Sequence, residues 1–187
     1  MSDLADRLRA LPSFPDDMPG LDPDAVPEDP AALFLVWLED AIASGARQPH
    51  AMTFQTLAED GAPIGRTLIL KDLDSRGLHV STHRTSRKGQ QLAADPRAAM
   101  TFFWRESGRQ VQVGGEVVAL NEATSQADWA SRPSYDGAPN LDWQVYALQP
   151  VRWEFTQSRL DRKHVRIGYE RAADGTWSHA RVTSPAG

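Results

Sequence analysis

The run Ser86-Arg87-Lys88-Gly89 places two cations where a helix is expected to begin. Ser86 is a favourable N-cap, and the first turn of a helix presents backbone N–H groups without intrahelical acceptors. The positive end of the helix dipole disfavours Arg87 and Lys88 unless an anion lies nearby. A phosphate group would accept hydrogen bonds from all these donors. The run therefore predicts a phosphate site, with a solvated basic turn as the alternative.

Two more cations, Arg66 and Lys71, bracket a β-prone run of six residues. Side chains alternate between the two faces of a strand, so this spacing puts the two cations on opposite faces unless a bulge intervenes. The run is expected to be the second of several strands.

Several kinds of chemistry are disfavoured by what the sequence lacks. Cysteine is absent, which excludes disulfides, thiolate metal centres and a cysteine nucleophile. No Gly-x-Gly-x-x-Gly or P-loop pattern occurs, and the five histidines are scattered, so neither a dinucleotide fold nor a metal site is predicted. The net charge of −5 argues against nucleic acid as the main partner. No apolar run approaches the ~20 residues of a membrane helix, so no membrane association and a cytoplasmic location are expected.

Strands are the main elements that must carry these residues. Turn residues at Asp60-Gly61 and Asp74–Gly77 predict an antiparallel meander of the first three strands, and Gly114-Gly115 predicts a bulge. The β-prone runs are residues 51–58, 64–71, 78–83, 98–104, 110–120, 151–155, 164–170 and 177–182. No strand–helix–strand alternation occurs. The predicted fold is mostly β, an antiparallel closed or split β-barrel with about three flanking helices.

The three helices are expected after Asp29-Pro30, Ser86 and Asn121, each of which begins with a capping side chain. Residues 1–29 are rich in proline and aspartate and predict an N-terminal arm with little regular structure. Residues 30–187 are expected to form the single folded domain.

Several spaced segments resemble the pyridoxamine 5'-phosphate oxidase family, whose fold is an FMN-binding split barrel. The segments are RTLILK (66–71), VSTHRTSRKGQQLAADPRAAMTFFW (80–104), RQVQVGGEV (109–117), SRP (131–133) and WEFTQSRLDRKHVRIGYER (153–171). They occur in the family's order and span most of residues 30–185. The resemblance implies a homodimer with FMN at the subunit interface.

Carried over residue by residue, the resemblance implies a set of FMN contacts. They are Arg66, Thr67, Lys71, Ser81, Thr82, Arg87, Lys88, Gln110 and Arg166. Arg87 and Lys88 would hold the phosphate, and the Gln110 amide would orient the flavin ring. Ser81 stands where the family has tyrosine.

The resemblance also implies a substrate site for pyridoxamine or pyridoxine 5'-phosphate. Lys71 and Arg132 would hold the substrate phosphate, while Arg162 and His164, the catalytic pair, would cover the ring and the C4' carbon. Hydride transfer from C4' to flavin N5 and reoxidation by dioxygen would then give pyridoxal 5'-phosphate in vitamin B6 metabolism.

Three departures from the family pattern affect the substrate side. Asp128 replaces a tyrosine, Asp136 replaces a phosphate-binding serine and Thr156 replaces a tryptophan; the segment from 132 to 153 is also shorter. The two carboxylates would repel a substrate phosphate.

These departures keep two other functions open. Residues 80–83 and 103–107 also resemble the phenazine-biosynthesis branch of the superfamily, whose flavin oxidases act on a tricyclic aromatic acid. The second alternative is a flavin-binding protein without turnover, which the presence of Arg162 and His164 disfavours.

Overall fold

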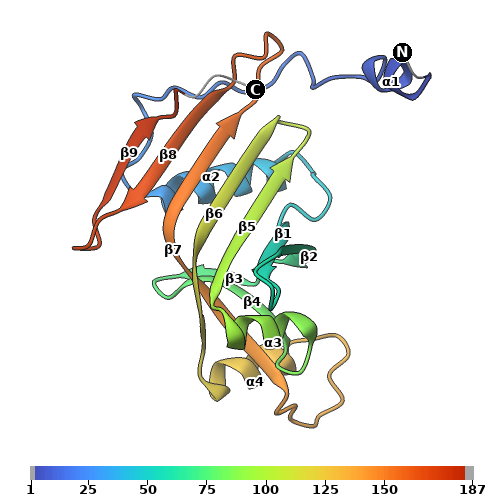
Figure 1. Cartoon of the computed structure of the whole chain (residues 1–187), viewed down its shortest axis with the longest axis vertical. Helices are drawn as coiled ribbons and strands as arrows, with labels where there is room; N and C mark the ends of the chain where they lie inside the picture. Colours follow the sequence, from blue (N-terminus) through green and yellow to red (C-terminus); the bar gives the residue numbers. More distant parts are fainter. Residues whose placement is uncertain (1–2, 184–187) are drawn as a thin grey trace.

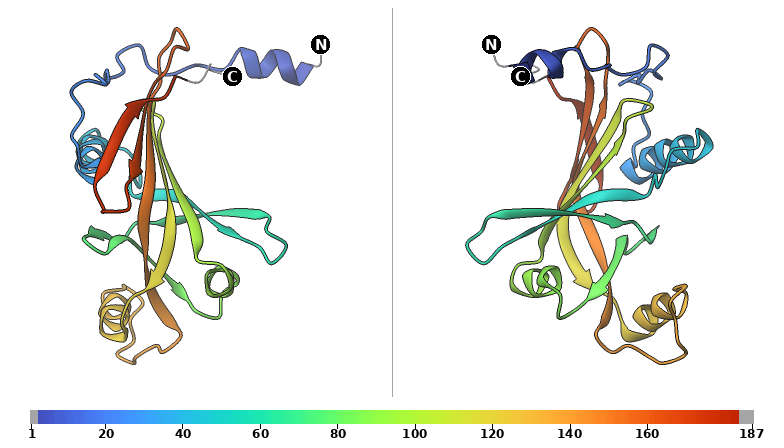
Figure 2. Two further views of the ribbon diagram at one scale, coloured as in Figure 1. Left: turned by 60° about the vertical axis from the view of Figure 1, so that its left-hand side comes forward. Right: turned by 90° about the vertical axis from the view of Figure 1, so that its right-hand side faces the viewer.

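A computed structural model describes residues 3–183 of the chain, and its centre is one antiparallel sheet of nine strands (Figure 1). The hydrogen-bonded order is β2-β1-β5-β6-β7-β4-β3, with β8 added beside β7 and β9 beside β8. The strands are β1 (Ala51–Leu57), β2 (Pro63–Ile69), β3 (Asp72–Asp74), β4 (Gly77–His83), β5 (Arg97–Trp104), β6 (Arg109–Ala119), β7 (Trp143–Gln157), β8 (Val165–Arg171) and β9 (Trp177–Arg181). The sheet curls without closing, and Figure 2 shows β1 and β2 crossing the long strands steeply. The predicted mostly β, antiparallel split barrel is confirmed.

The 15-residue strand β7 joins the two parts of this sheet. Its first half pairs with β4, its second half pairs with β8, and β6 follows both halves. The register of β6 shifts between Gly114 and Gly115, as expected from the two glycines. A Cβ at Gly115 would collide with the Gln149 carbonyl, so the shift requires glycine at this position. Residues 143–150 were not predicted as strand, because they form a buried run without alternation that ends at Pro150.

The first predicted hairpin forms, but the second, between residues 64–71 and 78–83, is wrong, and so is the predicted meander. β1 pairs with β2 and β3 with β4, whereas β4 takes β7 rather than β2 as its other partner. Residues 77–80 of β4 are all buried, because β4 lies between β3 and β7 and pairs with both. β2 also ends at Ile69, so Lys71 lies beyond the strand that it was expected to close.

Three helices flank the sheet, and each begins with the predicted cap. Asp29 accepts from the Ala31 N–H (2.9 Å) at the start of α2 (Pro30–Ala43), which buries Phe34 and Trp37 against the sheet. Ser86 caps α3 (Arg87–Ala94) and Asn121 caps α4 (Glu122–Ala130). α3 and α4 both lie at the end of the molecule away from β8 and β9 (Figure 1), on opposite sides of the sheet (Figure 2).

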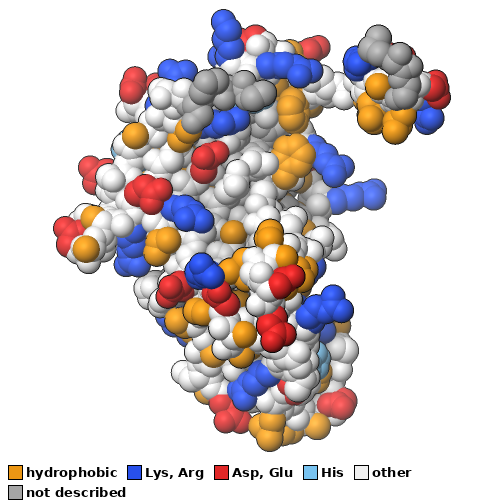
Figure 3. Space-filling view, in the orientation of Figure 1, with side chains coloured by type: hydrophobic (Ala, Val, Ile, Leu, Met, Phe, Trp, Pro, Cys, Tyr) orange, Lys and Arg blue, Asp and Glu red, His pale blue; other side chains and the backbone are white. Residues whose placement is uncertain are grey.

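The N-terminal arm has more structure than expected. It begins with a fourth helix, α1 (Asp3–Arg9), supported by an Asp6–Arg9 contact of 2.7 Å. The apolar side chains of α1 are exposed and stand away from the body (Figure 3). The following residues 11–29 contain neither helix nor strand but are attached to the barrel: Phe14 packs edge-on against Phe103, and the Tyr169 hydroxyl donates to the Pro27 carbonyl (2.8 Å). Within residues 3–183, no helix is long and apolar enough to cross a membrane.

Candidate functional site

A cluster of three cations forms where β2 meets the start of α3. Arg66 comes from β2, and Arg87 and Lys88 come from the first turn of α3. The Arg66 guanidinium is fixed by hydrogen bonds to Thr56 Oγ1 (2.7 Å) and Gln91 Oε1 (3.0 Å) and to a backbone carbonyl of β1. We call Arg66, Arg87 and Lys88 the cation cluster.

The electrostatics of the cation cluster favour a bound anion. Burial and the Arg87 charge lower the pKa of Arg66, while burial and the Arg66 charge lower the pKa of Lys88. Within residues 3–183, no carboxylate forms an ion pair with any of the three. Three converging positive charges without a counter-ion at a helix N-terminus fit a phosphate group.

The loop that precedes α3 is also built closely around this point. The Ser86 hydroxyl donates to the His83 carbonyl (2.7 Å) and lies 3.1 Å from the Thr82 hydroxyl. A Cβ at Gly89 would collide with the carbonyls of His83 and Arg84. Gly89 therefore lets the helix start pack directly on the end of β4, which fixes the cation cluster in place.

A second group of predicted residues lies on the outer face of β6, β7 and β8. Gln110, Thr156 and Arg166 are direct cross-strand partners. With His164 and Phe14 they line a cavity of about 380 Å³. Phe14 reaches this cavity from the N-terminal arm and adds an aromatic ring to its wall, which also contains Thr156, the residue that replaces the family's tryptophan.

The turn before β8 carries the predicted catalytic pair. His164 Nδ1 accepts the Arg159 backbone N–H (3.0 Å), so a neutral ring carries its proton on Nε2. Arg162 has a φ of +60°, a conformation that non-glycine residues adopt rarely. Arg162, His164 and Arg166 line a common cavity of about 390 Å³, so the structure brings these three predicted residues together.

A third group lines a cavity of about 300 Å³ near the end of β2. Thr67, Lys71, Ser81 and Arg132 contribute to its wall. This arrangement unites three predicted flavin contacts, Thr67, Lys71 and Ser81, with Arg132, and so brings together the two cations, Lys71 and Arg132, predicted for the substrate phosphate. We call it the anion cavity.

Of the two aspartates that depart from the family pattern, Asp128 contacts a cation of the anion cavity and Asp136 does not. Lys71 Nζ lies 3.2 Å from Asp128 Oδ1, and the Trp143 indole N–H donates to Asp128 Oδ2 (2.8 Å). Asp136 is exposed and accepts the Ala138 N–H of its own turn (3.0 Å). The expected conflict with an anion is therefore concentrated at Asp128.

The strand register separates the cation cluster from Gln110 within one chain. Arg66 is opposite Phe54, which is opposite the buried Met100, so Arg66 lies on the inward face. Gln110 is opposite Phe103. Phe103 follows Met100 by three residues on β5, an odd number, so Phe103 and Gln110 lie on the outward face. A single ligand cannot contact both groups of one chain without crossing the sheet.

Sequence reasoning missed the residues that support the predicted ones. Gln91 and Thr56 hold Arg66, and Phe14 covers the outer cavity. Gln91 follows Arg87 by four residues, so it lies on the same face of α3, a spacing that could have indicated it. The contact of Phe14 depends on the path of the arm and has no local signal.

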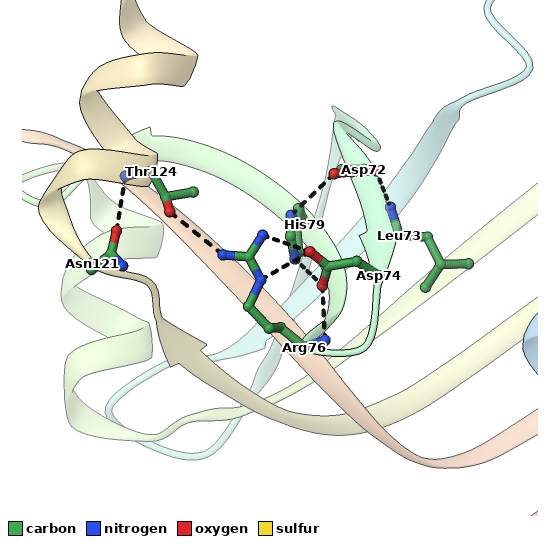
Figure 4. A network of polar contacts seen from close by, with 7 residues as sticks. All are labelled: Asp72, Leu73, Asp74, Arg76, His79, Asn121 and Thr124. Atoms are coloured by element: carbon green, nitrogen blue, oxygen red, sulfur yellow. Dashed lines mark hydrogen bonds and ion pairs between the residues drawn. The ribbon is translucent and has the colours of Figure 1, made fainter.

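Within the described part of the chain, one group of side chains has the composition of a metal site: Asp72, Asp74 and His79 (Figure 4). The two nitrogens of the buried His79 face different carboxylates, Nδ1 at 3.9 Å from Asp72 and Nε2 at 3.1 Å from Asp74 without hydrogen-bond alignment. Asp74 is also bound by Arg76, which reaches Thr124 of α4. The group belongs to a polar network around the Asp74–Arg76 ion pair, which connects the β3–β4 turn to α4.

An open antiparallel barrel with a cation cluster at a helix start defines a split-barrel fold with a site for an anionic ligand. The family model described as pyridoxamine 5'-phosphate oxidase matches residues 38–157, and that of the pyridoxine 5'-phosphate oxidase C-terminal dimerisation region matches residues 143–184. The chain belongs to the pyridoxamine 5'-phosphate oxidase family, which confirms the resemblance seen in the sequence.

Individual relatives agree with this assignment. The pyridoxine/pyridoxamine 5'-phosphate oxidase of Pseudomonas paraeruginosa is 38% identical, with 87% of this chain and 92% of the relative covered. That of Cupriavidus pinatubonensis is 34% identical, with 98% and 100% covered. Among solved structures, PhzG from Burkholderia lata in complex with tetrahydrophenazine-1-carboxylic acid superposes with a TM-score of 0.82 at 27% identity, covering 88% of this chain and 98% of PhzG. An FMN-binding protein from Nostoc punctiforme has the same fold, with a TM-score of 0.72 at 16% identity, covering 83% and 97%.

Proposed function

We propose that this oxidoreductase is an FMN-dependent oxidase of a small aromatic substrate. The observation that carries the proposal is the cation cluster, three positive charges at a helix start without a carboxylate partner in residues 3–183. FMN presents a phosphate of nearly two negative charges, which would restore the charge balance there. When bound, FMN supplies the hydride acceptor and passes the electrons to dioxygen.

The first candidate substrates are pyridoxamine and pyridoxine 5'-phosphate, oxidised to pyridoxal 5'-phosphate. The names of the relatives at 34–38% identity support this candidate. So does the presence of two cations, Lys71 and Arg132, in one cavity. His164 would donate from Nε2 toward the substrate, and Arg162 would hold the ring in position while hydride leaves C4'.

The second candidate is an aromatic substrate without phosphate. The ion pair between Lys71 and Asp128 favours it, because a phosphate would face the carboxylate. The similarity to PhzG supports the same candidate. A flavin carrier without turnover is the third reading, and the cavity shared by Gln110 and His164 argues for an enzyme instead.

The complete site is proposed to form between two copies of the chain. The cation cluster and Gln110 lie on opposite faces of one sheet, so a second copy must supply one group to a shared flavin. The match of residues 143–184 to a dimerisation region supports a homodimer. Light scattering of the FMN-loaded protein at micromolar concentration should give twice the chain mass; a monomer mass would contradict this arrangement.

The function is tested by dioxygen consumption of the FMN-loaded protein with pyridoxamine 5'-phosphate, pyridoxine 5'-phosphate and a cyclic aromatic acid. Turnover of either phosphate supports the first candidate, and turnover of the acid alone supports the second. FMN binding without oxidation of any of the three would favour the carrier. Failure to bind FMN would overturn the proposal as a whole.

A further inference from the structure

The charge of Lys71 is already compensated within the chain. Its ammonium lies 3.2 Å from Asp128, and the two side chains are only 25% and 15% exposed. Asp128 is held from its other oxygen by the Trp143 indole N–H at 2.8 Å. A carboxylate fixed by two contacts cannot easily turn away when a ligand enters the anion cavity. An incoming anion would therefore meet the pair rather than a free ammonium.

Arg132 is the cation that remains available. Its guanidinium lies over the Trp143 ring, 4.4 Å from the centroid, and 5.5 Å from that of Trp129. Within residues 3–183, no carboxylate or carbonyl accepts a hydrogen bond from it, and its Nε is buried without a partner. The contact with the Trp143 ring holds the guanidinium in place, and in residues 3–183 its two terminal nitrogens form no hydrogen bond. Together these two nitrogens match the two oxygens of a carboxylate.

The rest of the anion cavity is uncharged. Thr67 and Ser81 offer hydroxyl groups, and Leu68 and Ile69 offer apolar surface suited to the body of a ring. The sum of Lys71, Arg132 and Asp128 is one positive charge. A carboxylate monoanion balances that charge, whereas a phosphate monoester carries nearly two negative charges and would face Asp128.

We propose that Asp128 determines specificity by converting the anion cavity into a site for a ring-bearing monocarboxylate held by Arg132. This inference rests on the proposed function, because it places the ligand beside the flavin. Asp128 acts through Lys71: it cancels that charge and leaves Arg132 as the recognition group. The substrate class is then an aromatic carboxylic acid rather than a phosphate ester.

The test compares two probes that share one ring and differ in the anion, benzoate and phenyl phosphate. Their affinities for the FMN-loaded protein are measured by calorimetry and by flavin difference absorbance. The wild type should bind benzoate more tightly. Asp128→Asn should strengthen phenyl phosphate binding tenfold or more, while benzoate changes less than threefold. Asp136→Asn is the matched control and should leave the ratio of the two affinities unchanged, because Asp136 is held in its own turn.

Asp128→Tyr, which introduces the residue expected from the family, is the second variant and should shift the ratio in the same direction as Asp128→Asn. FMN affinity, measured first for every variant, separates the two levels of the argument. Loss of FMN binding by the wild type would refute the proposed function. If FMN binds but the wild type prefers phenyl phosphate, binds neither probe, or keeps its ratio in both Asp128 variants, the specificity role of Asp128 is refuted alone.

Discussion

Removal of two charges from the cation cluster should weaken FMN binding and leave riboflavin binding unchanged. In the variant with Arg87→Ala and Lys88→Ala, the phosphate keeps Arg66, which Thr56 and Gln91 hold in place. A hydrogen bond to a charged group contributes about 1.5–3 kcal/mol, so two such contacts set an upper range of about 3–6 kcal/mol. Relief of the repulsion between Arg66 and the two removed cations offsets part of this loss. The expected net loss is about 2–5 kcal/mol, or roughly 30-fold to a few thousand-fold in Kd.

Titration of the protein with FMN and with riboflavin, followed by quenching of flavin fluorescence, measures this difference. Riboflavin lacks the phosphate, so its Kd should change less than threefold. Arg97→Ala is the matched control: Arg97 follows the other end of α3 and pairs with Asp95 instead of joining the cluster. An equal loss for FMN and riboflavin would refute the assignment of the phosphate to this cluster.

Three further predictions concern Lys88, the predicted catalytic pair and the bulge at Gly115. FMN affinity should begin to fall at a lower pH than the titration of an ordinary lysine would cause, because burial and Arg66 lower the pKa of Lys88 and the ammonium that binds phosphate is lost earlier. Lys88→Arg should remove this pH dependence in a series of FMN titrations. Arg162→Ala and His164→Ala should each lower the turnover rate tenfold or more, about 1.4 kcal/mol in transition-state stabilisation, with unchanged FMN affinity. A loss of FMN binding in parallel with turnover would show that the pair binds the flavin instead. Gly115→Ala should destabilise the fold by about 2 kcal/mol or more in thermal unfolding, because its Cβ would meet the Gln149 carbonyl, whereas Gly20→Ala, with open space around it, should change stability by less than about 0.5 kcal/mol.

Local chemistry made the helix starts and the bulge predictable. Asp29, Ser86 and Asn121 each accept a hydrogen bond from the first turn that follows, so the signal and its partner lie within three residues. The register shift at Gly114-Gly115 was predictable for the same reason. The pairing partner of β4 was not predictable. β4 and β7 are some sixty residues apart in sequence, and the hydrophobic pattern does not indicate which edge a strand will join.

The candidate site divides in the same way. The residue types at positions 87 and 88 predicted a phosphate site, the family resemblance added Arg66, and the structure brings the three together. The sequence also showed that Asp128 departs from the family pattern, but its contact with Lys71 joins α4 to the segment after β2 and depends on tertiary structure. The roles of the individual side chains in binding and catalysis stay predictions until the variants are measured.

Strand β7 also limits how this chain can change. Trp143 at its start supports the anion cavity and Thr156 near its end lines the outer cavity, about 40 Å apart at ~3.3 Å per residue. An inserted or deleted residue after the bulge would exchange the faces of Glu154 and Phe155 and expose one of the most buried rings of the core. The loop of residues 131–142 has no such restriction, since it lies outside the sheet. Exchange of that loop, like substitution of Asp128, can therefore change the anion cavity while the spacing between the two cavities is retained.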